Sequence, residues 1–175
     1  MRKHNFAFID IETTGLDLLK HEIIEIGCVL ADSKLKKLEE FELKIKPIDI
    51  ENADPIALKV NRYNEEAWES AISLEKALKI LQEKTKDFIM VGHNVSFDIE
   101  FLTYAFNKTG IENRMHYHKL DTISMIWAKF HKDREIDHFS LHDMCEYFNI
   151  KNKNPHTGLG DARATYELYK KLMSL

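Results

Sequence analysis

The sequence has little cysteine, proline or glycine: two, three and six residues among 175. A disulfide scaffold would need more cysteine, and a long flexible linker would need more proline and glycine, so both are excluded. Cys28 and Cys145 each lie within an apolar pattern, which predicts two buried free thiols in a reducing compartment. The length and the hydrophobic share of 44% predict a single domain over residues 1–175 with a sizeable core.

The sequence also lacks long apolar runs and an excess of positive charge. The amino-terminal stretch MRKHNFAFIDIE is interrupted by Asp10 and Glu12, so we expect neither a secretion signal nor a membrane span, and a cytoplasmic protein. The formal net charge is −4 at pH 7, and the chain as a whole therefore does not attract phosphate. Any binding to nucleic acid must depend on a local site.

Hydrophobic patterning predicts three consecutive strands, followed by helices that alternate with shorter strands. The first three strands, at 5–12, 22–31 and 38–46, are rich in Ile, Phe and Val, and their short polar connections favour antiparallel hairpins. This order predicts an α/β fold, a mixed sheet with helices on both faces. Apolar spacing predicts the later strands at 88–93 and 116–121, and helices at 74–86, from the strand end to about 108, at 122–131, after Ser140 and at 160–173.

The stretch FIDIETTGL, residues 8–16, places two carboxylates inside an apolar strand. Side chains on a strand alternate between faces, so Asp10 and Glu12 share one face, roughly 6–7 Å apart at their Cα atoms. Like charges at this spacing repel and raise each other's pKa. A strand tolerates such a pair when a cation binds between them.

Two other segments bring acidic side chains to the start of a helix. VGHNVSFDIEFL, residues 91–102, has Asp98 in the first turn, where the helix dipole alone would also favour an anion. HTGLGDARAT, residues 156–165, has Asp161 near the start of the last helix and His156 in the preceding loop. Carboxylates that converge favour magnesium or manganese, and two such ions support phosphoryl displacement. A neighbouring histidine is suited to act as a general base.

These three segments resemble, in order and spacing, the three motifs of the DEDDh 3′–5′ exonuclease family. That family includes the proofreading subunit of the bacterial replicative polymerase, ribonuclease T and oligoribonuclease. The resemblance extends from residue 5 to about 172 and implies one exonuclease domain with a ribonuclease H-like fold, whose first three strands are antiparallel. It also implies two Mg²⁺ or Mn²⁺ ions, with Asp10 bridging both and His156 deprotonating the attacking water. The implied metal ligands are Asp10, Glu12, Asp98 and Asp161.

The resemblance implies that the substrate is the 3′ end of single-stranded DNA or RNA, and the product a nucleoside 5′-monophosphate. The turn Thr13, Thr14, Gly15 and Leu16 would meet the terminal nucleotide, with backbone amides at the 3′ hydroxyl and Leu16 on the base. The second motif adds three implied substrate contacts, His93, Asn94 and Phe97. Core packing explains Phe97 equally well, and Asp121–Thr122 matches a family dipeptide that is more often structural.

The sequence departs from the family pattern at two places. Gly158 stands where alanine is common, which predicts a looser loop, and Asn61-Arg62-Tyr63 replaces a His-Gly-Ile type sequence, which predicts an altered grip on the 3′ end. The chain ends at Leu175 without a tether, so we expect a stand-alone exonuclease, with untethered polymerase association and a homodimer left open. Two alternative functions also remain open: an inactive module that binds 3′ ends, and an oligoribonuclease-like enzyme for very short RNA.

Overall fold

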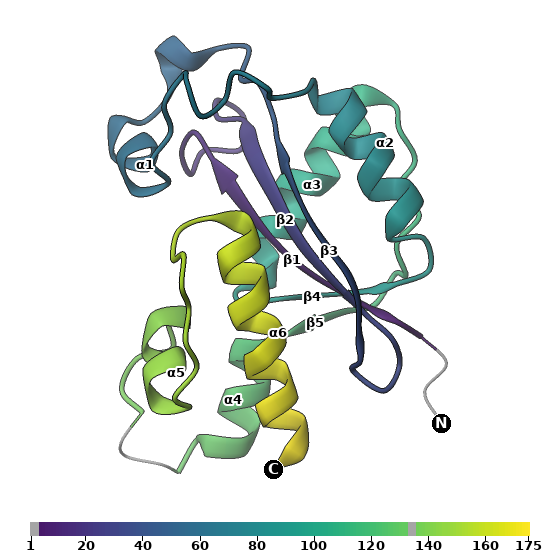
Figure 1. The fold of residues 1–175 in the computed structure, drawn as a ribbon, viewed down its shortest axis with the longest axis vertical. Helices are drawn as coiled ribbons and strands as arrows, with labels where there is room; N and C mark the ends of the chain where they lie inside the picture. Colours follow the sequence, from purple (N-terminus) through teal and green to yellow (C-terminus); the bar gives the residue numbers. More distant parts are fainter. Residues whose placement is uncertain (1–3, 133–135) are drawn as a thin grey trace.

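The structure is a computed structural model that describes residues 4–132 and 136–175. Its centre is a five-stranded sheet with the strand order β3-β2-β1-β4-β5 (Figure 1). The first three strands are antiparallel, whereas β4 and β5 run parallel to β1. This confirms the predicted mixed sheet, although the last strand is shorter than expected. The strands are β1 (Phe6–Thr13), β2 (Ile23–Ala31), β3 (Lys37–Lys44), β4 (Ile89–Gly92) and β5 (Lys119–Asp121).

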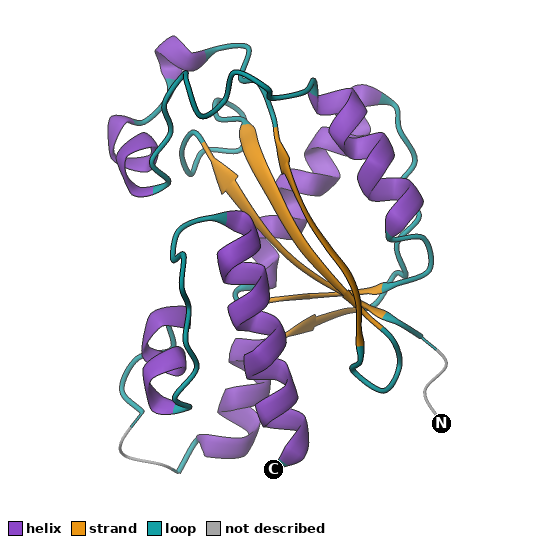
Figure 2. Ribbon diagram, in the orientation of Figure 1, coloured by secondary structure: helices purple, strands orange, loops and turns teal. Residues whose placement is uncertain are grey.

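Helices cover both faces of the sheet, as the pattern predicts (Figures 1 and 2). One face carries α2 (Leu74–Lys84) and α3 (Val95–Thr109), and the other carries α6 (Gly158–Ser174). The helices α4 (Thr122–Phe130) and α5 (Leu141–Tyr147) pack against α6. After β3, the chain forms a short 3-10 turn (Ile50–Asn52) and α1 (Pro55–Val60), which lie near the carboxyl end of β1.

The alternation of β1 decides which face receives the acidic residues. Ile9 and Ile11 face the core beneath α2 and α3, while Phe6 and Phe8 pack against tyrosines of α6. Asp10 and Glu12 continue the second series, so they lie on the α6 face, at the end of the sheet where α6 begins.

Side-chain caps define where the helices begin. The carboxylate of Asp54 accepts the N–H of Ile56 at 2.8 Å at the start of α1. The hydroxyl of Ser140 accepts the N–H of Asp143 at 3.2 Å, which confirms the predicted helix start after Ser140. The hydroxyl of Thr157 accepts the N–H of Gly160 at 3.1 Å. As a result, α6 begins at Gly158, two residues earlier than the apolar spacing predicts.

Two expectations from composition can be compared directly with the structure. Cys28 and Cys145 are buried and free, as predicted, and burial raises the pKa of both thiols. Within residues 4–132 and 136–175, no helix has the length and apolar character needed to cross a membrane.

The start of α6 is in backbone contact with β2. A Cβ added at Gly27 would lie 1.9 Å from the carbonyl carbon of Gly158, and one added at Gly158 would lie 2.7 Å from the nitrogen of Gly27. Neither position has room for a side chain without a shift of the backbone. The prediction that Gly158 loosens its loop is therefore wrong, because this glycine is what lets the helix reach the sheet.

We expect Gly27→Ala to lower the free energy of unfolding by about 1–3 kcal/mol or more, because the added methyl group overpacks a contact between two backbones. Urea denaturation measures the change. Gly110→Asn is the matched control, since Gly110 ends α3 at φ 69° with nothing within 4 Å of an added Cβ, and asparagine tolerates this conformation. Equal stability of the Gly27→Ala protein and the wild type would contradict the tight contact.

Candidate active site

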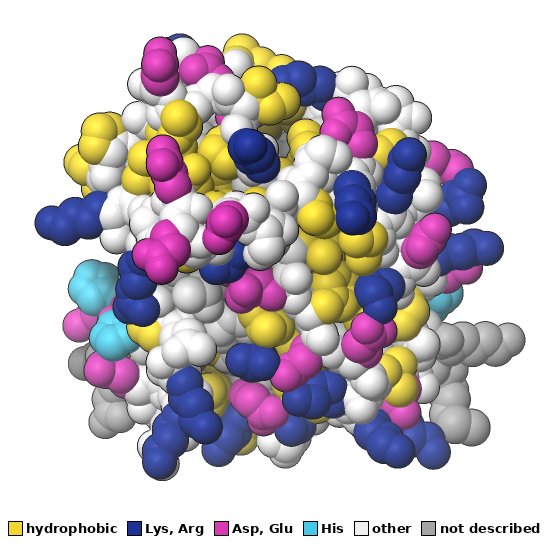
Figure 3. Space-filling model, turned by 45° about the horizontal axis from the view of Figure 1, so that its top comes forward, with side chains coloured by type: hydrophobic (Ala, Val, Ile, Leu, Met, Phe, Trp, Pro, Cys, Tyr) yellow, Lys and Arg dark blue, Asp and Glu magenta, His cyan; other side chains and the backbone are white. Residues whose placement is uncertain are grey.

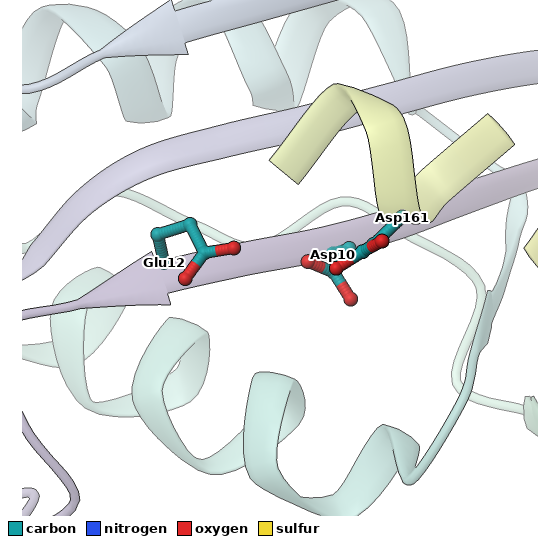
Figure 4. A group of neighbouring side chains, drawn as sticks. All are labelled: Asp10, Glu12 and Asp161. Carbon is teal, nitrogen blue, oxygen red and sulfur yellow. The ribbon is translucent and has the colours of Figure 1, made fainter. Parts of the chain in front are cut away.

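Three carboxylates meet where β1 ends and α6 begins. Asp10 and Glu12 come from β1, and Asp161 comes from the first turn of α6. One oxygen of each lies within 4.8 Å of the others, and Figure 4 shows the three groups facing a common space. Each of the three residues is half-buried. Asp10 and Glu12 therefore share one face of β1, as their spacing predicts. Asp161 of the third motif approaches the same face from α6.

Asp98 adds a fourth carboxylate from the first turn of α3. Its side chain is 4% exposed, and Oδ1 accepts the backbone N–H of Ile11 at 3.0 Å. The pairing of β4 with β1 ends at Val91 and Phe8, so this N–H lies beyond the paired part of the strand. Asp98 thus takes the place of a neighbouring strand and approaches Asp10 closely enough for its charge to raise the pKa of Asp10.

The environment strongly disfavours the ionised form of these groups. Burial, and then the charges of Asp98 and Asp161, raise the pKa of Asp10 well above its ordinary value. Burial followed by the charge of Asp161 raises the pKa of Glu12 to about 8, and burial raises the pKa of Asp98 to about 8. In the part of the chain that the structure describes, none of the four carboxylates forms an ion pair with Lys or Arg.

This donor set fits a hard divalent cation. It offers only carboxylate oxygens, held at a spacing that one ion can bridge, and among the described residues no Lys or Arg forms an ion pair with them. Magnesium, manganese and calcium prefer such ligands, and a bound cation would lower the pKa of each carboxyl. The structure therefore supports a divalent metal site at Asp10, Glu12 and Asp161, with Asp98 beside it.

The loop before α6 is tied to Asp161 at both of its carboxylate oxygens. The backbone N–H of His156 donates to Oδ2 at 3.1 Å, and the side-chain amide of Asn152 donates to Oδ1 at 2.5 Å. His156 itself is exposed and adopts a left-handed φ of 60°. Its side chain and Asp161 line one cavity of about 890 Å³ between α5 and the loop. The predicted placement of His156 over the same cleft as Asp161 agrees with this geometry.

Sequence reasoning missed two residues, Asn152 and Glu25, that hold Asp161 and the start of α6 in place. Nothing in the sequence distinguishes Asn152, because asparagine is common in polar loops. Glu25 is distinguishable, since it is a charged residue in the middle of the apolar strand EIIEIGCVLA. It is 2% exposed, lies opposite Glu12 in the β1–β2 register, and accepts the N–H of Gly158 at 2.6 Å. Burial, followed by the charge of Glu42, raises the pKa of Glu25 to about 7.

The turn after β1 is held by its own hydrogen bonds. The hydroxyl of Thr13 donates to the carbonyl of Gly15 at 2.7 Å, and the hydroxyl of Thr14 accepts the N–H of Glu22 at 2.9 Å. The N–H of Thr14 donates to the carbonyl of Glu22 at 2.9 Å, so this amide of the turn is already paired within the protein. Gly15 has a φ of 156°, and a Cβ there would lie 2.5 Å from the ring of His21.

An apolar cavity of about 280 Å³ opens beside Glu12. Leu16, which is 80% exposed, forms one wall, and Phe97 forms another while also packing on Phe101 at 4.9 Å between ring centroids. Phe97 thus packs on the core and also lines the cavity. Asn61, 3% exposed, donates its side-chain amide to the carbonyl of Thr13 at 3.0 Å. The departure from the family pattern at Asn61 therefore ties α1 to the end of β1.

His93 and Asn94 serve to connect elements in this structure. The Nε2 of His93 lies 2.6 Å from the carbonyl oxygen of Phe139, which can only accept, so Nε2 carries the proton. Burial lowers the pKa of His93, and its Nδ1 lies 2.8 Å from the hydroxyl of Thr122, which donates to the carbonyl of Gly92 at 3.2 Å. Asn94, at φ 64°, donates its N–H to Asp121 at 3.0 Å. Asp121 and Thr122 are structural, as expected.

A ribonuclease H-like sheet with carboxylates gathered at the end of its first strand defines a nuclease-type site. The chain belongs to the exonuclease family, whose sequence model matches residues 7–169. This confirms the resemblance on which the site residues were chosen. The shared motifs account for the positions of the carboxylates on β1, α3 and α6.

The similarity to individual proteins covers nearly all of this chain but a small part of its relatives. A PolC-type DNA polymerase III of Caldanaerobacter subterraneus subsp. tengcongensis is 32% identical over 96% of the chain and 11% of its own length. The 3′-5′ exonuclease DinG of Staphylococcus epidermidis is 28% identical over 93% of the chain and 17% of its length. E. coli exonuclease I bound to a dT13 oligonucleotide shares the fold, with a TM-score of 0.83, 17% identity, and coverage of 98% of this chain and 41% of that one.

We expect the free energy of unfolding, measured in a chelator, to fall as the pH rises from about 4.5 to about 8. The carboxyl of Glu12 has a pKa of 4.5 when unfolded and about 8 when folded, so the folded state binds more protons in this interval. Glu12→Gln should therefore weaken the decline and be the more stable protein at pH 8. Urea denaturation at a series of pH values measures both effects.

The matched control for this substitution is Glu69→Gln, an exposed residue outside the site. It should keep the wild-type pH dependence. A Glu12→Gln protein that is less stable than the wild type at pH 8 in chelator would show that Glu12 is stabilised, and not destabilised, by its surroundings.

We expect Mn²⁺ at about 100 times its dissociation constant to raise the melting temperature of the wild type by about 5–10 °C over the value in chelator, because the ion binds only the folded state. Asp10→Ala should lose this increase, while Glu69→Gln should retain it. Differential scanning calorimetry checks the result, and an equal increase in the Asp10→Ala protein would place the bound ion elsewhere.

Proposed function

We propose that this chain is a metal-dependent 3′-to-5′ exonuclease, in which residues 1–175 form one catalytic domain acting on single-stranded DNA or RNA. The observation that carries the proposal is the group of Asp10, Glu12 and Asp161, whose oxygens lie within 4.8 Å of one another on the fold of an exonuclease family member. The reaction would hydrolyse the last phosphodiester bond and release a nucleoside 5′-monophosphate.

In this proposal, Asp10, Glu12, Asp161 and Asp98 would hold two Mg²⁺ or Mn²⁺ ions. When bound, the ions supply positive charge that stabilises the phosphoryl group in the transition state. The protein supplies the geometry, because Asp98 is fixed by the N–H of Ile11 and Asp161 by Asn152 and the N–H of His156. Little rearrangement of the backbone is then needed for the ligands to act.

His156 is the proposed general base. It is exposed, lines the same cavity as Asp161, and its backbone is held by the Asp161 carboxylate. An imidazole at this position would take the proton from the attacking water, solvent would supply a proton to the departing 3′ oxygen, and the imidazole would then release its own proton to solvent. General-base catalysis of this kind contributes about 10²–10⁴-fold to the rate.

The apolar cavity beside Glu12 is the proposed site of the terminal nucleotide. The exposed side chains of Leu16, Ile56 and Val60 face it together with Phe97, while the amide of Asn61 is already paired with Thr13. Such walls can contact the face of any base and read no hydrogen-bond pattern, so the enzyme should tolerate every terminal base. The structures of E. coli exonuclease I with dT13 and dA16 support single-stranded substrates of different sequence.

The face shown in Figure 3 carries charges of both signs. In Figure 3, basic and acidic side chains alternate over the face, and neither sign forms one dominant patch. Both a stand-alone role and work beside a DNA polymerase fit the proposal, and the similarity to PolC-type polymerases supports the second. We place the enzyme in the cytoplasm, where its two buried thiols would stay reduced.

The test is digestion of 3′- and 5′-labelled single-stranded DNA and RNA oligomers of matched sequence, with Mn²⁺ or with a chelator. We expect stepwise shortening from the 3′ end that requires metal. The ratio of the DNA and RNA rates names the preferred sugar, and a series of oligomer lengths separates a general exonuclease from one specific for very short RNA.

Three variants assign the roles in the same assay. Asp10→Ala should abolish digestion, and His156→Gln should lower kcat by about 10²–10⁴-fold, whereas the exposed His118→Gln should have the wild-type rate. Binding without any digestion by the wild type would identify a module that only recognises 3′ ends. Full activity of His156→Gln would remove the histidine from the mechanism.

A further inference from the structure

An aromatic pair with one exposed member lies next to His93 of the second motif. Trp127 of α4 is 52% exposed, and its ring stacks on that of Phe139 with centroids 4.7 Å apart and an angle of 18° between the planes. The other tryptophan, Trp68, is only 6% exposed and donates its ring N–H to the carbonyl of Ile24 at 3.0 Å. Exposure of a tryptophan held in a fixed stack is unusual for a residue whose only task is packing.

One hydrogen bond connects this pair to the second motif. The carbonyl of Phe139 accepts the Nε2–H of His93 at 2.6 Å. His93 directly follows β4, the strand that pairs with β1, and precedes α3, which carries Asp98. The aromatic pair is therefore fixed to the junction of two elements that border the candidate active site.

The pair and the apolar cavity adjoin different strands. The cavity opens next to Glu12, at the end of β1, whereas His93 and Phe139 adjoin the end of β4. A strand whose last nucleotide fills the cavity and whose last phosphate lies at the carboxylates leaves the site away from the cavity. We infer that this exit path runs past the aromatic pair.

Basic side chains border the same path. Ser140, which follows Phe139, lines the cavity of about 890 Å³ that ends at Asp161 and His156. The exposed Lys151 and Lys153 line it as well. Proteins that bind single-stranded nucleic acid combine aromatic side chains that stack on bases with basic side chains that contact the phosphate backbone.

We propose that Trp127 and Phe139 form a stacking subsite for bases on the 5′ side of the cleaved bond. This proposal rests on the proposed exonuclease function and says how the enzyme would bind a longer strand. The open face of Trp127 stacks on a base of any identity, and only substrates with several nucleotides reach it. The subsite thus favours longer single strands over the shortest oligomers.

The test compares a substrate that reaches the subsite with one that does not. The p-nitrophenyl ester of thymidine 5′-monophosphate carries one nucleotide, whereas an eight-nucleotide single strand extends past the carboxylates. Trp127→Ala should raise KM for the eight-mer about tenfold and leave hydrolysis of the ester unchanged, while Trp127→Phe should restore most of the loss. Tyr117→Ala is the matched control, since Tyr117 is 74% exposed and lies at the opposite end of β5 from the site. It should behave as the wild type on both substrates.

A second measurement does not need turnover. In the Asp10→Ala protein, the eight-mer should quench the fluorescence of Trp127, and the added substitution Trp127→Phe should remove that quenching. Unchanged KM for the eight-mer in Trp127→Ala, or an equal loss on the ester, would overturn the subsite. If the wild type hydrolyses neither substrate, the exonuclease proposal fails, and the fluorescence titration still decides whether Trp127 meets a strand.

Discussion

The contact between the backbone of α6 and the backbone of β2 is the constraint on which the rest of the site depends. Gly27 and Gly158 approach so closely that neither position accommodates a side chain, and Glu25 holds the N–H of Gly158. Because the helix starts there, its first turn delivers Asp161 to the carboxylates of β1. The same start fixes the loop that carries His156, so the geometry of two motifs follows from one packing contact.

The acidic groups are held in place by neutral donors. The N–H groups of Ile11, His156 and Gly158 and the amide of Asn152 hold Asp98, Asp161 and Glu25, and within the described ranges no Lys or Arg forms an ion pair with them. Neutral donors orient a carboxylate without cancelling its charge. An ion pair would fill the same place with a side chain and remove the attraction for a metal. The carboxylates therefore remain available to a metal, but their burial without a paired cation lowers the free energy of unfolding of the metal-free protein.

Sequence reasoning recovered the parts that depend on local periodicity. The alternation of β1 places Asp10 and Glu12 on one face, and the motifs find Asp98, Asp161 and His156 because each stands at a fixed distance from a strand end or helix start. Contacts between distant segments were not accessible. The pairing of Gly27 with Gly158 joins residues 131 positions apart, and the effect of Asn152 exists only once its loop returns to α6. The misjudged role of Gly158 has this same cause, since a residue's neighbours in space decide it.

The hydrogen bond between Asp98 and Ile11 means that acidic residues of one site are not equivalent as targets for inactivation. Asp10 uses its carboxylate to serve the site, but Asp98 also completes the hydrogen bonding of the open edge of β1. Truncating Asp98 leaves a buried N–H without an acceptor, which destabilises β1 in addition to removing a carboxylate from the site. An inactive variant made at position 98 therefore loses stability and activity together, whereas one made at position 10 loses activity alone. To trap a substrate on an intact fold, substitution of Asp10 is the suitable choice and substitution of Asp98 is not.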